Sequence, residues 1–201
     1  MRRRALLALL ALPGCSLLPE RPYRPVQRFT LSPPLGAARP APRRAPVLLV
    51  RTFRAAPGLE ARGLRVLEAD GQVVMEPWAE WVAPPADLAE EALRRQLTAS
   101  GRFAAVTAPG SRLRADLVLE AELSGLEAVR AEGLARARLS GLLMTEAGEA
   151  GRVLDQFTVT GEAPLSGTGP AAEAAAMTAA LGVALEQVEG RLATATATGR
   201  R

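Results

Sequence analysis

Three runs in the second half of the chain alternate apolar and polar residues in steps of two, and this pattern constrains the fold most strongly. They are DLVLEAELSGLEAV (116–129), LARARLSGLLMT (134–145) and RVLDQFTVTGEAPL (152–165). Such alternation is typical of β-strands with one buried face. The turn-forming segments RAEG (130–133) and EAGEAG (146–151) separate the runs. The second half therefore predicts a three-stranded meander whose apolar face needs a cover.

Charged residues occupy the polar positions of these strands. In the first run Leu117, Leu119, Ala121 and Leu123 share one face, and Asp116, Val118, Glu120 and Glu122 share the other. In the second run Arg136 and Arg138 alternate with apolar residues, so we expect them to pair across the strands with Glu120 or Glu122. Carboxylates at every second position are also what a solvated strand face shows, and we predict no metal site there.

The first half predicts further strands. PVLLVRTF (46–53) has the composition of a buried strand, and RFAAV (102–106) is a short one. GLRVLEADGQVVMEP (63–77) predicts a hairpin in which Asp70-Gly71 forms a two-residue type I′ turn. QRFTLSP (27–33) alternates enough either to add a short edge strand or to remain part of an extended segment, and both alternatives stay open.

Two segments have helical periodicity. For DLAEEALRRQLTASG (87–101) we predict Asp87 as the N-cap, Glu90 as its capping-box partner and Gly101 as the left-handed C-terminal residue. The inward face of this helix would carry Leu88, Ala92, Leu93, Gln96 and Leu97. A final helix over residues 171–193 would bury Met177, Leu181, Ala184, Leu185, Val188 and Leu192.

These elements predict an α+β domain over residues 46–196, followed by a frayed tail (197–201). We expect a two-layer sandwich: a mainly antiparallel sheet with two amphipathic helices packed on one of its faces.

The N-terminus has the parts of an export signal. Three arginines (residues 2–4) precede eight apolar residues (5–12), a run too short to span a bilayer. LPGC (12–15) then resembles the lipobox of bacterial lipoproteins, except that Pro13 replaces a small residue. The resemblance implies a signal peptide over residues 1–14, cleavage between Gly14 and Cys15, and lipidation of Cys15, the single cysteine. An ordinary secretory signal is the alternative.

A proline-rich segment follows Cys15. Residues 16–46 contain eight prolines, so we predict an extended, lipid-anchored tether over residues 15–45. Ser16 stands where aspartate would signal retention in the inner membrane of enteric-type bacteria. We therefore expect attachment to the periplasmic face of the outer membrane, with the inner membrane as the alternative.

Composition argues against several function classes. The chain has 25 basic and 21 acidic residues, and removal of a signal with three arginines leaves a net charge of +1. This near-neutral balance gives no support for nucleic-acid binding. The sequence contains neither histidine nor lysine, which removes the commonest metal ligand and general base. We therefore predict no enzymatic activity, no catalytic residues, no cofactor and no metal.

Two tryptophans stand out in EPWAEWVAPPADL (76–88), because the chain has seven aromatic residues in all. Trp78 and Trp81 precede the first predicted helix. Either residue can fill the junction between sheet and helix, or form an exposed contact for a partner protein or lipid. For Trp81 the junction is the preferred interpretation, and for Trp78 both alternatives stay open.

These landmarks, in this order, resemble the ABC-type transport auxiliary lipoproteins. They are the lipobox cysteine, RFTLSP (28–33), an apolar strand (47–50), WVAPPADLAEEALRRQL (81–97) with SGRFAAV (100–106), ADLVLEAEL (115–123) and the final helix. Phe29 replaces a tyrosine common in the family, and RTFRAAPGLEARGL (51–64) departs from its usual pattern.

The resemblance implies a docking or binding subunit of an intermembrane lipid transport system. Its partners would be a mammalian-cell-entry-type channel protein and an inner-membrane ABC transporter, and homo-oligomerisation is also possible. The alternative is an outer-membrane assembly lipoprotein that plugs or chaperones a β-barrel.

Overall fold

The computed structural model describes residues 23–146 and 151–198. The predicted signal peptide, its cleavage site and the lipidation site Cys15 lie outside the described residues. Among the residues that are described, none of the helices combines the length and the apolar character needed to span a bilayer.

The described residues form eight strands and two α-helices: the seven strands and two helices that the sequence predicted, and the edge strand that it left open. In chain order they are β1 (Gln27–Phe29), β2 (Val47–Ala55), β3 (Gly63–Leu67), β4 (Val73–Trp81), α1 (Pro85–Ala99), β5 (Ala105–Thr107), β6 (Leu117–Val129), β7 (Leu134–Thr145), β8 (Val153–Pro164) and α2 (Pro170–Thr198). A single 3₁₀ turn, Arg130–Glu132, links β6 to β7. The predicted α+β class is confirmed.

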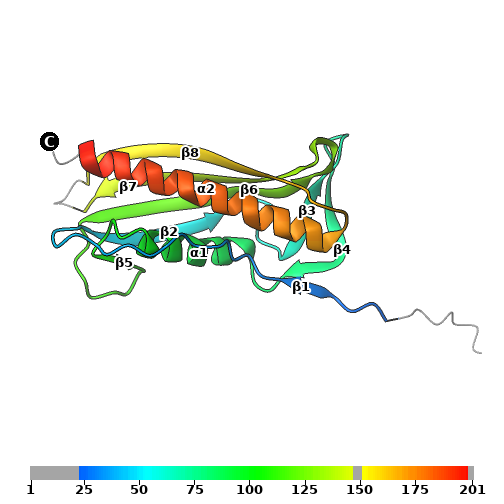
Figure 1. The fold of residues 1–201 in the computed structure, drawn as a ribbon, viewed down its shortest axis with the longest axis horizontal. Coiled ribbons are helices and arrows are strands. Elements are labelled where there is room, and N and C mark those ends of the chain that lie inside the picture. The colour runs from blue at the N-terminus through cyan, green and yellow to red at the C-terminus, as the bar shows by residue number, and fades with distance from the viewer. Residues whose placement is uncertain (1–22, 147–150, 199–201) are drawn as a thin grey trace, which may run out of the picture.

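The sheet is mixed and forked. β6, β7 and β8 form the predicted antiparallel meander. β2 and β3 both pair with β6 in parallel, β2 with residues 117–123 and β3 with Ala128 and Val129. Beyond the fork, β5 extends the β2 branch, whereas β4 and then β1 extend the β3 branch. The β3–β4–β1 branch lies at the end of the long axis where the described chain begins (Figure 1).

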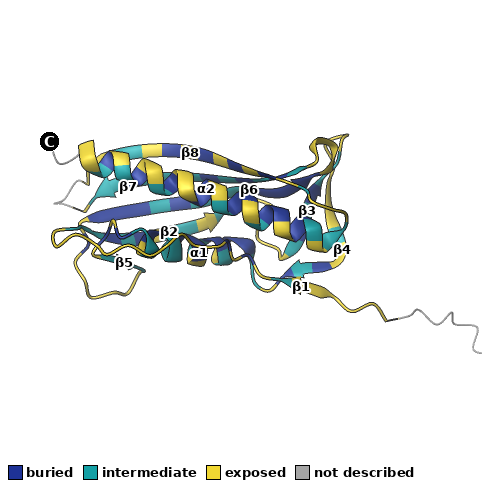
Figure 2. Ribbon diagram, viewed as in Figure 1, coloured by how far each residue is buried: buried dark blue, intermediate teal, exposed yellow. Residues whose placement is uncertain are grey.

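Both helices cover the same face of the sheet. α1 packs on β2, β5 and β6, and α2 packs on β6, β7 and β8 and against α1. α2 presents its buried residues to the sheet and its exposed residues to solvent (Figure 2). At Gly161 of β8 a Cβ atom would collide with the backbone of Ala180 and Ala184 in α2. A residue without a side chain therefore permits this close approach of helix and sheet.

Two predicted end signals differ in the structure. Pro85 is the first residue of α1 and Pro84 its N-cap, so the predicted capping box of Asp87 and Glu90 is wrong. Proline is favoured at the first helical position because it has no N–H to leave unpaired. Gly101 is left-handed at the C-terminal end, as predicted.

The β3–β4 turn is also different. Gly71 has a φ of +84°, but Asp70 is not left-handed, so the predicted type I′ turn is wrong. Gly71 N–H donates to Glu68 O (3.0 Å) and Glu68 N–H donates to Gln72 O (2.9 Å), which closes a three-residue loop of type I turn and glycine bulge.

Part of the predicted tether folds against the domain. β1 pairs in parallel with β4, which is the edge-strand alternative for residues 27–33. Leu31 is 2% exposed, and Arg39 N–H donates to Ala99 O at the end of α1 (2.9 Å). The folded region therefore begins about 20 residues before the predicted boundary at 46, because apolar side chains between the prolines reach the core. At the other end α2 continues to Thr198.

The predicted cross-strand ion pairs have other partners. Arg136 pairs with Glu162 (2.7 Å) and Glu132 (2.8 Å), and Arg138 pairs with Glu127 (2.8 Å). The β6–β7 register places Leu142 opposite Glu120 and Ser140 opposite Glu122, so the predicted pairing is wrong. The predicted turn over residues 130–133 is the one that the structure has, and counting back from it already places Glu127 opposite Arg136.

Candidate functional site

The two tryptophans of β4 have opposite environments. Trp81 is 1% exposed and belongs to the hydrophobic core, where β4 meets the start of α1. Its backbone N–H donates to Arg62 O (2.7 Å), which fixes this end of the strand. Trp78, three residues earlier, is 54% exposed. Only Trp78 of this pair is therefore available to a binding partner.

Trp78 owes its exposure to an unusual backbone conformation. Its φ is +62°, the one positive value among the non-glycine residues that the structure describes. This left-handed region is rare for a bulky side chain. Pro77 precedes it and cannot donate a hydrogen bond to a neighbouring strand. Such strain often marks a functional position, since surrounding structure must maintain it.

Further apolar side chains of the same strand are exposed. Val73, Val74 and Met75 are 46%, 39% and 43% exposed, and together with Trp78 we call them the β4 surface. Val73, Val74 and Met75 pair with β3, and successive strand residues point to opposite faces, so both faces of the strand contribute. Figure 2 shows exposed residues along this hairpin, at the end of the molecule that also carries β1. Contiguous exposed apolar residues indicate an interaction site.

One arginine ties the β3–β4 hairpin to the rest of the fold. Arg130 donates to Glu68 (2.7 Å) and Glu76 of the hairpin and, through two nitrogens, to Glu173 of α2 (2.9 and 2.8 Å). We call these four residues the Arg130 cluster. The hydrogen bonds that Arg130 donates to Glu173 are the main reason that the pKa of Arg130 is raised above its ordinary value. The guanidinium therefore stays charged, and it holds three carboxylates in place.

The Arg130 cluster includes a buried charge. The Glu173 side chain is 3% exposed, and its Oε2 atom has no hydrogen-bond partner among the described residues. The Glu76 side chain is 11% exposed. A buried carboxylate is costly unless a cation compensates it. Arg130 therefore compensates this charge at the point where the hairpin, α2 and the β6–β7 turn meet.

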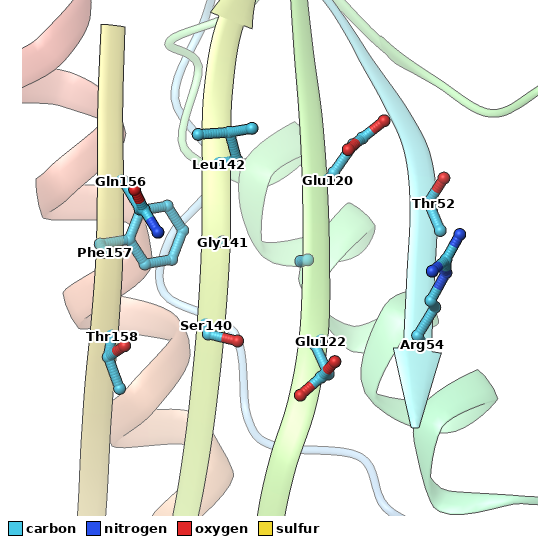
Figure 3. Close-up of a pocket in the computed structure, with 11 residues that line it drawn as sticks. Thr52, Arg54, Glu120, Glu122, Ser140, Gly141, Leu142, Gln156, Phe157 and Thr158 are labelled. Carbon is cyan, nitrogen blue, oxygen red and sulfur yellow. The ribbon is translucent and has the colours of Figure 1, made fainter. Parts of the chain in front are cut away.

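The sheet face opposite the helices carries a shallow hollow of about 360 Å³. Its polar lining comes from four strands: Thr52 and Arg54, Glu120 and Glu122, Ser140, and Gln156 and Thr158. Figure 3 shows these side chains on one side of the strands, with the helices behind. Gly141 lies at the centre, where the Phe157 ring occupies the space on the helix side. The hollow is open and polar, and resembles a docking face more than an enclosed ligand pocket.

Two acidic side chains, Asp116 just before β6 and Glu120 within it, have neighbours that give them structural roles. Asp116 accepts a hydrogen bond from Val47 N–H at the start of β2 (2.8 Å), and Glu120 lies 3.8 Å from Arg51. Across residues 23–146 and 151–198, no group of three or more acidic, cysteine or histidine side chains is arranged to hold a metal ion.

The sequence did not indicate the Arg130 cluster or the hollow. The cluster joins residues 68, 76, 130 and 173, which no local motif connects. The alternation of β6, β7 and β8 did predict a polar sheet face, but the contribution of β2 depends on the fork. Exposure of Trp78 was one of two open alternatives, and Pro77 next to it was the available signal.

The comparison with family models gives a match over residues 29–189, to the ABC-type transport auxiliary lipoprotein component. The chain belongs to this family. Residues 29–189 include α1, about two thirds of α2, the fork of the sheet, the β4 surface and the Arg130 cluster. The family resemblance inferred from the sequence is therefore confirmed.

Solved structures agree with this family assignment. Protein XCC0632 from Xanthomonas campestris, described as a member of the family DUF330, is 26% identical, with a TM-score of 0.73, and the match covers 87% of this chain and all of that one. A second crystal structure, of a protein described as uncharacterized, is 14% identical with a TM-score of 0.65, over 84% of this chain and 99% of that one. Its likeness concerns the fold alone. The comparison with curated sequences gave no match.

Proposed function

We propose that this auxiliary lipoprotein is a lipid-anchored, periplasmic docking subunit of an intermembrane lipid transport system. Its partners would be a mammalian-cell-entry-type channel protein and an inner-membrane ABC transporter. The observation that carries the proposal is the family match over residues 29–189, which names an auxiliary component of ABC-type transport. Anchoring at the outer membrane, through diacylated Cys15 after removal of residues 1–14, is part of the same proposal.

The geometry supports a docking role over a catalytic one. The described residues place a polar, open sheet face on one side and the exposed β4 surface at one end. Among the charged residues of the hollow, Glu120 has a neighbouring arginine, Arg51, at 3.8 Å. A domain of this kind can bind a protein surface without chemistry, and attachment to a membrane raises the effective concentration for that binding.

The anchor is tested by Cys15→Ala in the full chain. We expect the wild-type protein in the outer-membrane fraction and the variant as an unprocessed precursor or in the soluble periplasm. Mass spectrometry of the wild-type protein should find an acylated N-terminal cysteine. A bare thiol on the mature protein would contradict the anchor.

The partners are tested by crosslinking the lipidated protein in native membranes and identifying the products. Recovery of a channel protein with mammalian-cell-entry domains, together with its ABC transporter, is the expected result. Recovery of an outer-membrane β-barrel instead would favour the alternative function in barrel assembly. A second variant, Arg54→Glu with Glu122→Arg, exchanges the two charges that are opposed across β2 and β6. Capture of the partner should weaken in this variant if the hollow is the docking face.

A further inference from the structure

The exposed apolar residues of β4 lie where the chain leads towards the proposed anchor. The described chain begins at Tyr23, which is 87% exposed, and continues through Val26, which is 39% exposed, into β1. β1 pairs with β4 from Gln27 and Ala79 onward, so Val26 and Trp78 come directly before the same paired position on neighbouring parallel strands. The β4 surface therefore continues into the segment that precedes β1.

The length of chain before Tyr23 limits where this end can lie. Cys15 is eight residues upstream, and eight residues span at most about 28 Å when fully extended. If lipid chains hold Cys15 in a bilayer, the β1–β4 end is the end of the domain held nearest to that bilayer. The segment between β5 and β6 lies at the opposite end of the long axis (Figure 1).

The chemistry of this end suits a bilayer surface. Tryptophan and tyrosine are enriched at membrane–water interfaces, where an apolar ring meets polar headgroups. Arginines lie on the β1 side of the two aromatic residues: Arg24 is exposed, and Arg28 and Arg62 share a single carboxylate, Glu80, at 2.8 and 3.3 Å. These four groups carry a net positive charge, which anionic headgroups attract. The hairpin itself carries the opposite balance, since Arg130 faces the three carboxylates of its cluster.

We propose that Trp78 and the neighbouring apolar residues of β4 and Val26 rest in the headgroup region of the anionic bilayer that carries the anchor. This inference rests on the proposed lipid attachment. A membrane contact would explain why the chain keeps Trp78 in a strained, left-handed conformation that interrupts the regular strand and leaves the indole exposed. The contact fixes the orientation of the domain, and it leaves the open sheet face available to a protein partner.

Tryptophan fluorescence tests the contact without a label, because the chain has two tryptophans and Trp81 is buried. The full lipidated protein is reconstituted in vesicles of phosphatidylethanolamine and phosphatidylglycerol, with or without bromine on the acyl chains. We expect a blue shift of the emission, quenching by the brominated lipids, and about a twofold fall in quenching by aqueous acrylamide, since an indole at the interface loses roughly half of its aqueous surroundings.

Two variants are the controls. Trp78→Phe leaves Trp81 as the sole emitter and should show neither the shift nor the change in acrylamide quenching. Addition of Leu113→Trp to this variant puts a tryptophan at a site that is 58% exposed, close to the 54% of Trp78, but between β5 and β6. We expect this tryptophan to remain accessible to acrylamide and unaffected by the brominated lipids.

Equal responses of Trp78 and the tryptophan at position 113 would overturn the proposal. So would a Trp78 that stays accessible to acrylamide in vesicles and becomes protected only when the channel protein is added. Mass spectrometry of Cys15 tests the anchor separately. A bare thiol with quenching by brominated lipids retained would refute the anchor and support the membrane contact.

Discussion

Trp78 illustrates how one residue can be unfavourable for stability and suited to an exposed role. For an L-amino acid the left-handed conformation costs roughly 1–2 kcal/mol, and glycine avoids this cost. Trp78 has a φ of +62° in a strand whose other described non-glycine residues do not share it. The residue is therefore a place where stability and binding should respond in opposite directions.

We expect Trp78→Gly to be more stable than Trp78→Ala by about 1 kcal/mol, the reverse of the usual order. Both variants remove the indole, so the comparison isolates the backbone strain. Chemical denaturation of the two proteins measures the difference. Val74, which is exposed on the same strand and has no positive φ, is the matched control, and there the alanine variant should be the more stable.

Gly161 and Gly190 make a second residue-scale comparison. A Cβ at position 161 would collide with the backbone of α2, whereas a Cβ at position 190 would meet nothing within 4 Å. We expect Gly161→Ala to destabilise the fold by about 2–3 kcal/mol through overpacking. Gly190→Ala should instead stabilise it by up to about 1 kcal/mol, because alanine favours a helix interior. Thermal unfolding of both variants distinguishes the two effects, and equal shifts would contradict the close packing of α2 on β8.

At the scale of elements, the Arg130 cluster joins the β3–β4 hairpin to α2. Removal of its one cation leaves Glu173 buried and uncompensated. We expect Arg130→Gln to cost about 2 kcal/mol, less than for a fully buried pair, because the Arg130 side chain is 39% exposed. Urea denaturation measures the loss.

The cluster has a specific double variant as its control. Glu173→Gln in the Arg130→Gln background removes the buried charge, so it should recover part of the lost stability. If the stability lost in the double variant equals the sum of the losses in Arg130→Gln and Glu173→Gln, Arg130 and Glu173 do not interact. Amide hydrogen exchange should localise the effect of Arg130→Gln to residues 63–81, since the hairpin loses its link to α2.

The elements themselves were largely evident from the sequence, and their connections were not. Alternation placed β6, β7 and β8, and helical periodicity placed α1 and α2, because each pattern reflects one buried face of one element. The fork forms because β2 and β3 both pair with the same edge of β6. The alternation within β2 or β3 does not indicate which strand each one pairs with. The tether boundary was set too late because prolines near β1 outweighed two apolar residues, Phe29 and Leu31, that the core accommodates.

The candidate sites divide in the same way: local features were evident from the sequence, and contacts between distant segments were not. The sequence singled out the tryptophan pair, whose composition and proline neighbours are local features. It did not anticipate the Arg130 cluster, because charge partners 43 to 62 residues apart in sequence meet only after α2 and the hairpin are docked. Pairing of Arg136 and Arg138 was predicted with the wrong glutamates, although the turn over residues 130–133 places Glu127, and not Glu120 or Glu122, opposite Arg136.

At the scale of the whole molecule, the charge network should be insensitive to pH near neutrality. The chain has no histidine, and its ion pairs join arginine to carboxylates. Interaction with Glu173 and Glu162 raises the pKa values of Arg130 and Arg136. The stability that a raised pKa contributes is fully present below the ordinary pKa of arginine and is lost only above it. We expect the free energy of unfolding to be nearly constant between about pH 6 and pH 9, because ordinary pKa values of carboxylates and arginine lie outside that window.

Denaturation at several pH values measures this constancy. A loss of stability within the window would point to a titrating group that the ion pairs do not account for.

The fork at β6 has a consequence for how the chain matures. β2 can join β3 in the sheet only after β6 has formed, and β6 lies more than 60 residues further along the chain. An exported polypeptide crosses a membrane with its N-terminal part first. In the export proposed for this chain, β2 therefore reaches the periplasm before β6 and cannot pair with it until β6 has also crossed. Contacts of long sequence separation form slowly. By contrast, β6, β7, β8 and α2 follow one another along the chain, so their mutual contacts are close in sequence. Folding should therefore proceed from the C-terminal half towards the N-terminus, in the opposite direction to synthesis.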